Sequence, residues 1–380
     1  MRVAVVHSFY SSSQPSGENT VVLAQVDALA GAGHDVKLIS QHTDDSSSRR
    51  AYKLRAALSA ANIGGPSPQD ALEAFRPDII HGHNLFPNWG TNWLGRWGRK
   101  TVFTLHNYRT VCASGILWRD GHECTECISH SSARSLRHRC YRNSTPATIP
   151  LAWSTRSQGE NSPTLNKARS LIVLNAKALE FYRNLRPEAD LNLIPNFAEP
   201  VQAVNTLHRN EWIYVGRLVP EKGIGWLLDN WPLNHRLTIV GAGPLEEHVA
   251  QAAKNQPERF RFLGRQNPNE TRQAIARAHG LILPSLWAEG IPTVALEALQ
   301  SGTPILVSDR CASAAELTEG GAGHVFTLDR LGKSLAESLT AVEMDEKIRI
   351  RAAQAYQRRY SEDVWIKRIE ELYDRIAAHS

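Results

Sequence analysis

The chain has 380 residues, of which 42% are hydrophobic and 21% charged, with 25 Gly and 19 Pro. This composition is typical of soluble globular proteins and excludes a fibrous, collagen-like or globally disordered chain, and the length suits two domains of roughly 150–200 residues. No apolar run approaches the ~20 residues of a membrane span and the N-terminus has no signal-peptide pattern, so we expect a cytoplasmic protein.

The net charge of +5 is unevenly distributed. Residues 1–195 contain 22 Lys and Arg against 15 Asp and Glu, whereas residues 196–380 contain 21 against 23. A basic half indicates an anionic partner. Because no helix-turn-helix, zinc-finger or RNA-binding motif is present, we do not expect nucleic acid. An anionic lipid surface or a phosphate-bearing substrate fits better.

Short apolar runs alternate with helical patterns along the first half. The loop Ser11–Gly17 follows the first run, and Thr20–Ala32 has apolar residues at helical spacing. This alternation predicts a doubly wound α/β domain with its functional loops at the carboxyl ends of the strands. The predicted strands are Val3–Val6, Val36–Ile39, Asp78–Ile80, Thr101–Leu105 and Ser170–Leu174.

The same alternation restarts in the second half and predicts a second doubly wound domain over residues 196–360, after a first domain over residues 1–195. The boundary falls in Ile194–Pro200, where two prolines stiffen a linker. We expect a cleft between the domains, and residues 361–380 to form a helix, with Ser361 as its N-cap, that packs back toward the first domain. The predicted strands are Trp212–Val215, Leu237–Val240, Phe260–Leu263, Gly280–Leu283 and Pro304–Val307.

A glycine-bracketed string, Gly216–Gly223 (GRLVPEKG), follows the first of these strands. Arg217 and Lys222 can converge on a diphosphate around its turn, since Arg provides a planar fork and Lys a point charge. The N-terminus of the following helix would add its dipole. The alternative is a surface turn with solvated charges.

A second string, Glu289–Glu297, precedes and enters a predicted helix, Thr293–Leu299. Backbone N–H groups at the start of this helix would form a cradle for an anion. Two carboxylates placed in this way suit hydroxyl-bearing rings on either side of a diphosphate. The alternative for Glu297 is an acid that only favours the helix dipole.

These strings resemble known sequence elements. Glu289–Glu297 resembles the E-x7-E signature of retaining glycosyltransferases of family 4, which have the two-domain GT-B fold. Gly216–Gly223 is similar to the GRL-x-x-EKG element of that family, and Val240–Leu245 to its VG-x-GPL segment. In the first half, His83–Pro87 and Thr104–Arg109 look like loops of its first domain.

The resemblance implies a reaction and a set of residue roles. A sugar would pass from a nucleotide-diphosphate sugar, with UDP or GDP as the nucleotide, to a glycan or lipid-linked acceptor in polysaccharide or glycolipid synthesis. The transfer would retain the anomeric configuration and need no cofactor or metal ion. The implied catalytic residues are Arg217, Lys222, Glu289 and His106, the donor-binding residues are Gly17, Gly216, Gly290, Ile291, Pro292, Thr293 and Glu297, and the acceptor region contains His83 and Asn107.

Four cysteines, spaced C-x11-C-x2-C-x12-C, lie in a basic insertion at about residues 110–145. In a cytoplasmic chain this pattern favours a structural zinc site over disulfides, with free thiols as a further alternative. The predicted ligands are Cys112, Cys124, Cys127 and Cys140.

Two basic stretches of the first half could rest on anionic lipid headgroups, so we expect peripheral contact with the inner face of a membrane. The alternative is a solvated face with partly buried tryptophans. The stretches contain Arg134, Arg137, Arg139 and Arg142, and Trp93, Arg96, Trp97, Arg99 and Lys100.

Three other functions compete with a glycosyltransferase. A nicotinamide-dependent dehydrogenase is disfavoured because Gly241-Ala242-Gly243 is followed by Pro244 and no G-x-G-x-x-G follows a strand. A phosphorylase-like enzyme lacks a recognisable pyridoxal-binding lysine. A catalytically silent subunit that binds a sugar nucleotide is the remaining alternative, and turnover would distinguish it.

Overall fold

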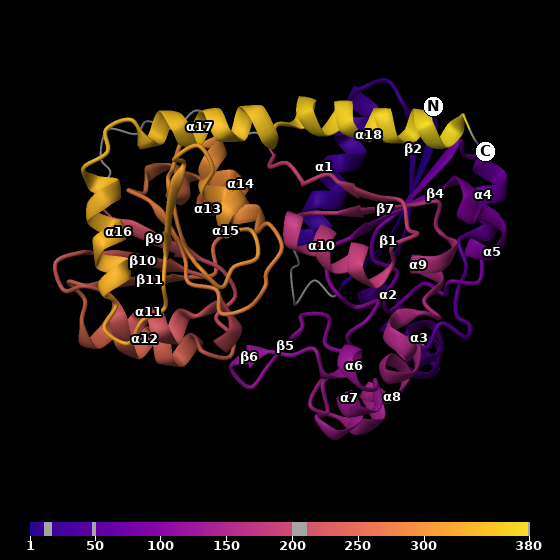
Figure 1. The fold of residues 1–380 in the computed structure, drawn as a ribbon, viewed down its shortest axis with the longest axis horizontal. Helices are drawn as coiled ribbons and strands as arrows, with labels where there is room; N and C mark the ends of the chain where they lie inside the picture. Colours follow the sequence, from indigo (N-terminus) through magenta and orange to yellow (C-terminus); the bar gives the residue numbers. More distant parts are fainter. Residues whose placement is uncertain (11–16, 48–50, 200–210, 379–380) are drawn as a thin grey trace. The chain divides into compact units, whose positions relative to one another are not determined.

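The computed structural model describes residues 1–10, 17–47, 51–199 and 211–378. The chain divides into two compact units (Figure 1). The expected Ser11–Gly17 loop, apart from Gly17, and Pro200 of the expected linker lie outside the described residues. Unit 1 comprises Met1–Leu117, Cys124–Pro195 and Trp365–Ser380, and unit 2 comprises Trp118–Glu123 and Asn196–Val364.

Unit 1 contains a six-stranded sheet in the order β2-β1-β3-β4-β7-β8, with every neighbouring pair parallel. The chain order reverses between β1 and β3, and the carboxyl ends of strands at such a point open a crevice. The strands are β1 (Arg2–Phe9), β2 (Asp35–His42), β3 (Ile79–Gly82), β4 (Thr101–Leu105), β7 (Ser170–Val173) and β8 (Leu191–Leu193).

The sequence prediction for this sheet was incomplete at two places. β1 continues beyond its apolar run through His7 and Ser8, which are both fully buried. Both residues are bonded inside the unit, since the Trp89 indole donates to the His7 carbonyl at 2.9 Å and the Asn88 amide to Ser8 Oγ at 2.9 Å. β8 was not predicted because its three residues are only half-buried.

Helices of unit 1 flank this sheet, and α18 joins them from the far end of the chain. Ser361 accepts a hydrogen bond from the Val364 amide at 3.4 Å, so it caps α18 as expected. The helices are α1 (Gly17–Gly31), α2 (Thr43–Ser47), α3 (Tyr52–Ala60), α4 (Gln69–Phe75), α5 (Leu94–Trp97), α6 (Glu126–Ser129), α7 (Ala133–Arg137), α8 (Thr145–Ser154), α9 (Pro163–Lys167), α10 (Ala176–Leu185) and α18 (Glu362–Ala377), with short 3-10 turns η1 (Gly98–Lys100) and η2 (Ser157–Gly159).

Unit 2 contains a second six-stranded parallel sheet, in the order β11-β10-β9-β12-β13-β14. The two parallel α/β domains predicted from the sequence are therefore confirmed. The strands are β9 (Trp212–Val215), β10 (Leu237–Val240), β11 (Phe260–Gly264), β12 (Leu281–Leu283), β13 (Ile305–Ser308) and β14 (Gly323–Phe326), and a small antiparallel pair is formed by β5 (Trp118–Arg119) and β6 (His122–Glu123).

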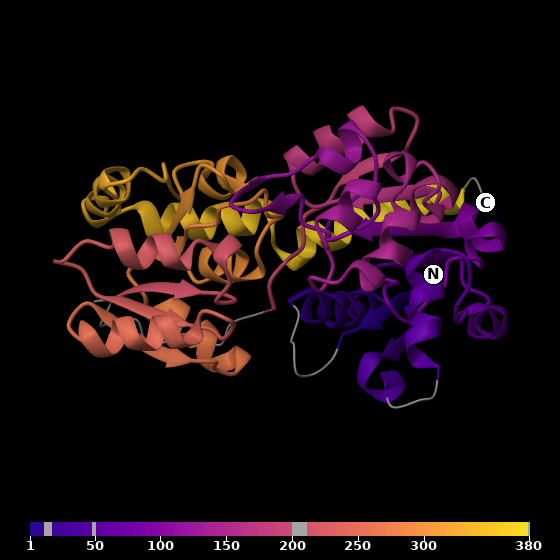
Figure 2. The ribbon, with the colours of Figure 1, turned by 90° about the horizontal axis from the view of Figure 1, so that it is seen from below.

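Both faces of the unit 2 sheet are covered by helices (Figure 2). Alternate residues of a strand point to opposite faces. Accordingly Ile213 and Val215 join one core cluster, with α14 and α17, whereas Trp212 and Tyr214 join the other, with α11 and α16. The helices are η3 (Pro220–Lys222), α11 (Ile224–Asn230), α12 (Glu246–Asn255), α13 (Pro268–Arg277), α14 (Thr293–Gln300), α15 (Ala314–Thr318), α16 (Lys333–Glu343) and α17 (Ile348–Arg359).

One aromatic residue expected at a membrane interface lies in the core instead. Trp93 is 2% exposed, and its indole donates to the Gly90 carbonyl at 3.0 Å. The ring packs against Phe103 of the central strand β4, so apolar burial outweighs the pattern of its basic neighbours. In the described part of the chain, every helix is too short or too polar to cross a bilayer.

Candidate active site

The loops predicted to bind a nucleotide sugar meet at one point of unit 2. The chain order of its sheet reverses between the paired strands β9 and β12, and ligands of such sheets bind at the carboxyl ends there. Gly216-Arg217 follows β9 directly, and Pro284-Ser285 follows β12. Residues 67 positions apart therefore come into contact, as the Lys222–Glu289 bond shows.

Glu289 is held from two sides at this point. It is 7% exposed, it forms an ion pair with Lys222 Nζ, and it accepts from Ser285 Oγ at 2.6 Å. A lysine ammonium has three donor hydrogens, so the bond to Glu289 leaves two for a ligand. Lys222 is thus oriented by a buried carboxylate while its remaining donors are available to an anion.

Arg217 has a weaker carboxylate partner. Its guanidinium lies 3.5 Å from Glu221, and its own side chain is 60% exposed. Exposed ion pairs of this kind contribute roughly 0–1 kcal/mol, so a phosphate could replace the carboxylate at little cost. Glu221 also fixes the turn, because its carbonyl accepts from the Leu286 amide at 2.9 Å.

Two glycines allow these loops to pack closely. Gly223 has φ +73°, and a Cβ there would lie 1.8 Å from the Pro284 carbonyl oxygen. Gly241, at the end of β10, has φ +153°, and a Cβ would lie 1.9 Å from the Gly216 carbonyl oxygen. Any side chain at either position would separate the loop after β9 from its neighbours.

Helix α14 begins at Thr293, as predicted, immediately after the loop that contains Gly290, Ile291 and Pro292. The first amides of a helix lack partners one turn back, although the Ala295 amide donates to the Pro292 carbonyl at 3.0 Å, and the anion cradle at this helix start stays a prediction. Glu297 lies one turn further along. Burial raises the pKa of its carboxyl to about 7, with Glu199 acting in the same direction and Arg272 against it.

The predicted residues of unit 1 form a separate cluster. His83 Nδ1 and His106 Nε2 lie 3.0 Å apart, and Asn107 Oδ1 accepts from the Arg109 amide at 2.9 Å. Burial lowers the pKa of His106 to about 3 and that of His83 well below its usual value, so both rings are neutral at pH 7. His81 bonds Thr104 and the Tyr373 hydroxyl of α18, both at 2.7 Å, and supports this cluster from behind.

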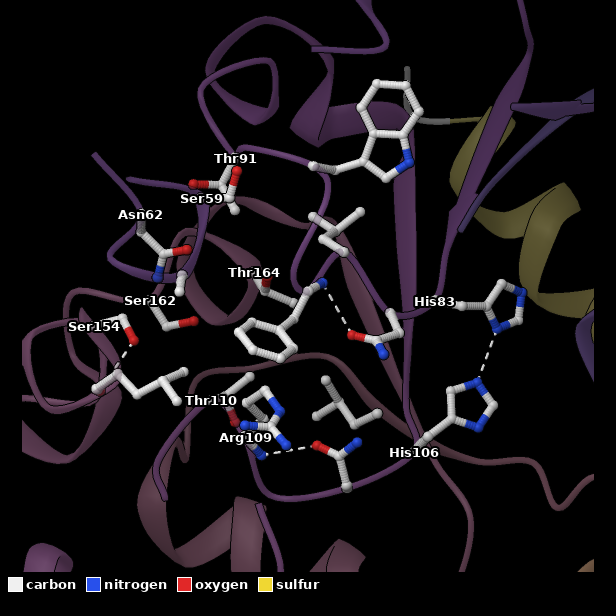
Figure 3. A pocket seen from close by; sticks show the side chains of 18 of the residues that line it. Ser59, Asn62, His83, Thr91, His106, Arg109, Thr110, Ser154, Ser162 and Thr164 are labelled. Carbon is white, nitrogen blue, oxygen red and sulfur yellow. Dashed lines mark hydrogen bonds between the residues drawn. The ribbon is translucent and has the colours of Figure 1, made fainter. Parts of the chain in front are cut away.

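A cavity of about 100 Å³ lies beside this cluster (Figure 3). The loops after β3 and β4 form one part of its wall, and α1, α3, α8 and α9 form the rest. All of its lining residues belong to unit 1.

Gly17 and the four cysteines do not line this cavity, and the donor-binding role of Gly17 stays a prediction. Gly17 is exposed and is the first residue of α1. Burial raises the pKa of the Cys127 thiol to about 12, and the thiols of Cys112, Cys140 and Cys124 act in the same direction. No disulfide joins them, and the described residues contain no group of three or more side chains arranged to hold a metal ion. The zinc site stays a prediction.

Sequence reasoning did not identify several residues of the two clusters. Glu221 could have been found from its spacing to Arg217, since an Asp or Glu four residues from an Arg is a common ion-pair signal. Ser285 and Arg109 carry no such local signal. Their roles depend on which loops the fold brings together.

Two family models match the chain. Residues 15–201 match the model described as Glycosyltransferase Family 4, and residues 209–344 match the one described as Glycosyl transferases group 1. A phosphatidyl-myo-inositol mannosyltransferase of Mycobacterium leprae is 30% identical over 175 residues, which are 43% of this chain and 46% of that protein. The chain thus spans about half the length of the curated relatives it matches.

Solved structures resemble the whole chain. A sucrose-phosphate synthase from Thermosynechococcus elongatus is 16% identical, with a TM-score of 0.69 and coverage of 100% of both chains. HepE of Anabaena, solved in complex with UDP, is 16% identical, with a TM-score of 0.60 over 98% of this chain and 100% of that one. These similarities confirm the expected GT-B fold.

Proposed function

Since residues 15–201 and 209–344 match the models of two glycosyltransferase families, we propose that the chain is a retaining glycosyltransferase that needs no metal ion. It transfers the sugar of a UDP or GDP sugar to a hydroxyl of a glycan or lipid-linked acceptor, in polysaccharide or glycolipid synthesis. The name of the Mycobacterium leprae relative supports a lipid-linked acceptor, and the UDP complex of HepE supports UDP.

The observation that carries the proposal is the convergence of charges at the reversal point of the unit 2 sheet. Arg217 and Lys222 both lie on the loop that follows β9, and Lys222 is oriented there by Glu289, which follows the neighbouring strand β12. Breaking a glycosyl–phosphate bond places negative charge on the leaving diphosphate. Fixed cations and helix amides stabilise that charge without reorganisation. Arg217, Lys222 and the start of α14 are suited to this task.

For the remaining residues we propose the roles that the sequence resemblance implies. Glu289 accepts hydrogen bonds from sugar hydroxyls, and Glu297 from the ribose. The acceptor hydroxyl attacks from the face of the leaving group, whose departing phosphate oxygen takes the proton. No side chain is then needed as a base. A His106 ring with a pKa of about 3 is a poor base at pH 7, which supports a positioning role.

We expect one nucleoside diphosphate to raise the Tm in a panel of UDP, GDP and ADP, because a ligand that binds only the folded state stabilises it by mass action. A ligand at 100 times its Kd contributes about 2.7 kcal/mol. The shift should persist in EDTA if Arg217 and Lys222 replace a metal ion. A Tm that no nucleotide moves would contradict the donor site, and a shift abolished by EDTA would contradict metal independence.

We also propose that unit 1 contacts an anionic membrane through α3 and α8, which pack together (Figure 1). Leu54 of α3 is 62% exposed, and Ile149 and Trp153, one turn apart on α8, are 54% and 51% exposed. The Arg156 guanidinium lies 4.0 Å from the Trp153 ring centroid. Exposed apolar and aromatic groups among cations suit a layer of anionic headgroups.

Vesicle binding tests this surface. The chain should sediment with phosphatidylglycerol vesicles, and a variant with Lys53→Gln and Arg55→Gln should bind more weakly, by roughly fivefold per charge. The matched control replaces Lys177 and Arg183, two exposed cations of α10, by glutamine. If both double variants lose vesicle binding equally, the net charge of the chain and not this surface determines binding. If the wild-type chain binds uncharged vesicles as strongly as phosphatidylglycerol vesicles, the electrostatic part of the proposal is wrong.

A further inference from the structure

The cavity of unit 1 is lined mainly by groups that can exchange hydrogen bonds with hydroxyls. Side-chain hydroxyls and amides come from segments far apart in the sequence, and the rings of Phe86 and Trp89 supply apolar surface. Small-molecule sites combine apolar walls with a few convergent polar groups, and this cavity has both. Ser59, Asn62, Thr110, Ser154, Ser162 and Thr164 are among these polar residues (Figure 3).

Three buried side chains of this wall each have a polar atom without a hydrogen-bond partner among the described residues. Ser59 is 5% exposed, and Thr91 and His83 are each 4% exposed. Within the described residues, Ser59 Oγ, Thr91 Oγ1 and His83 Nε2 form no hydrogen bond. A buried polar atom without a partner costs about 1–3 kcal/mol, so such atoms indicate a missing ligand or water. Figure 3 shows Ser59 and Thr91 on the side of the cavity away from His83.

Among the described residues that line the cavity, Arg109 is the only arginine or lysine. Its Nη1 donates to the Ala113 carbonyl at 3.1 Å and its Nη2 to the Ser114 carbonyl at 3.4 Å, and the guanidinium lies 4.5 Å from the centroid of the Phe86 ring. Its Nε has no acceptor among the described residues. A guanidinium has five donor hydrogens, so three remain for a ligand.

Among the other titratable groups of the described wall, Glu18 is the one that can carry a negative charge. Arg109 forms no ion pair in the described part of the chain. Glu18 shares the cavity, and burial raises the pKa of its carboxyl to about 7, with Arg109 acting against that rise. His83 and His106 are neutral at pH 7 because burial lowers their pKa values.

We propose that this cavity binds the acceptor sugar and that Arg109 recognises an anionic group, a carboxylate or a phosphate, on that sugar. The inference rests on the proposed function and adds the chemical class of the acceptor. Ser59, Thr91 and His83 then bond ring hydroxyls, while Arg109 binds the anion through charge-assisted hydrogen bonds. Arg109 is accordingly a specificity residue and takes no part in the chemistry.

Equilibrium binding of three related probes tests the proposal without any donor. The probes are glucose, glucuronic acid and glucose 1-phosphate, titrated by ligand-detected NMR against the full chain. At least one anionic probe should bind about tenfold or more tightly than glucose, as one additional charge-assisted bond predicts. Preference for the phosphate would indicate an acceptor with a phosphorylated anomeric carbon, and preference for the carboxylate a uronic acid. Equal binding of all three probes, or binding of none, would overturn the proposal.

An Arg109→Gln variant should lose this preference, whereas Arg183→Gln, the same change at an exposed arginine of α10 outside the cavity, should retain it. If Arg109→Gln fails to fold, Arg109→Lys and the ranking of probes on the wild-type chain decide the question. UDP and GDP are titrated into the same samples. If the wild-type chain binds neither UDP nor GDP, the result counts against the proposed function. If the Arg109 variants keep the wild-type preference among the probes, the result counts against this inference alone.

Discussion

Replacement of Lys222 by alanine should lower turnover by about 100-fold or more. Turnover is measured as the release of nucleoside diphosphate from a sugar nucleotide. The nucleotide is the one that raises the Tm in the panel described above. The change removes a cation aimed at the leaving diphosphate. It also leaves Glu289, which is 7% exposed, without its counter-ion. Both effects act at the same point of unit 2, so the loss should be far larger than that of a surface charge.

Lys333→Ala is the matched control for this variant. Lys333 lies on α16 of the same unit, its side chain is 80% exposed, and its pairing with Glu337 is of the weak surface kind. Turnover and Tm should both be unchanged there. A Lys222→Ala protein that folds and turns over within tenfold of the wild type would contradict the charge-clamp assignment. A wild-type chain that binds a nucleotide but never releases one from its sugar would instead support the silent subunit.

Gly223→Ala should destabilise the protein by at least about 2 kcal/mol and abolish nucleotide binding. A Cβ would lie 1.8 Å from the Pro284 carbonyl oxygen, and φ is +73°, so both the contact and the backbone conformation oppose a side chain. Relief of the contact must move the turn that contains Lys222 away from the end of β12. A Tm decrease of about 4 °C or more is expected for a unit of this size.

Gly225→Ala, two residues away, serves as the control because nothing lies within 4 Å of a Cβ at that position. Gly225 is inside α11, where alanine is favoured over glycine by about 0.5–1 kcal/mol. Its Tm should be unchanged or slightly raised, and its nucleotide affinity unchanged. Similar destabilisation of both variants would mean that helix α11, and not the contact with Pro284, is sensitive to substitution.

The sequence predicts the two sheets well because buried parallel strands have short, continuous apolar runs that end at glycine, proline or polar turns. It also predicts the start of α14, since Pro292 precedes a run of helix-forming residues. Such signals are local. The extension of β1 through His7 and Ser8 was missed because buried polar residues resemble a loop until their partners, on another segment, are known.

The chemistry of the sites depends on contacts between distant residues. Lys222 and Glu289 meet only because β9 pairs with β12, and strand order is not contained in the periodicity of either strand. The cavity around Arg109 is assembled from residues between Glu18 and Thr164. Trp93 shows the opposite error, since its basic neighbours predicted a surface whereas packing against Phe103 places it in the core.

The position of α18 determines the order in which the units can be completed as the chain is synthesised. Its buried residues belong to unit 1, although they leave the ribosome after every segment of unit 2; they are Trp365, Ile369, Leu372, Tyr373 and Ile376. Until then the apolar surface that they cover is open to water and His81 lacks the Tyr373 hydroxyl. Unit 2, whose segments end at Val364, emerges complete first. The first half of the chain must therefore wait for residues that are translated after unit 2 before its own fold can close.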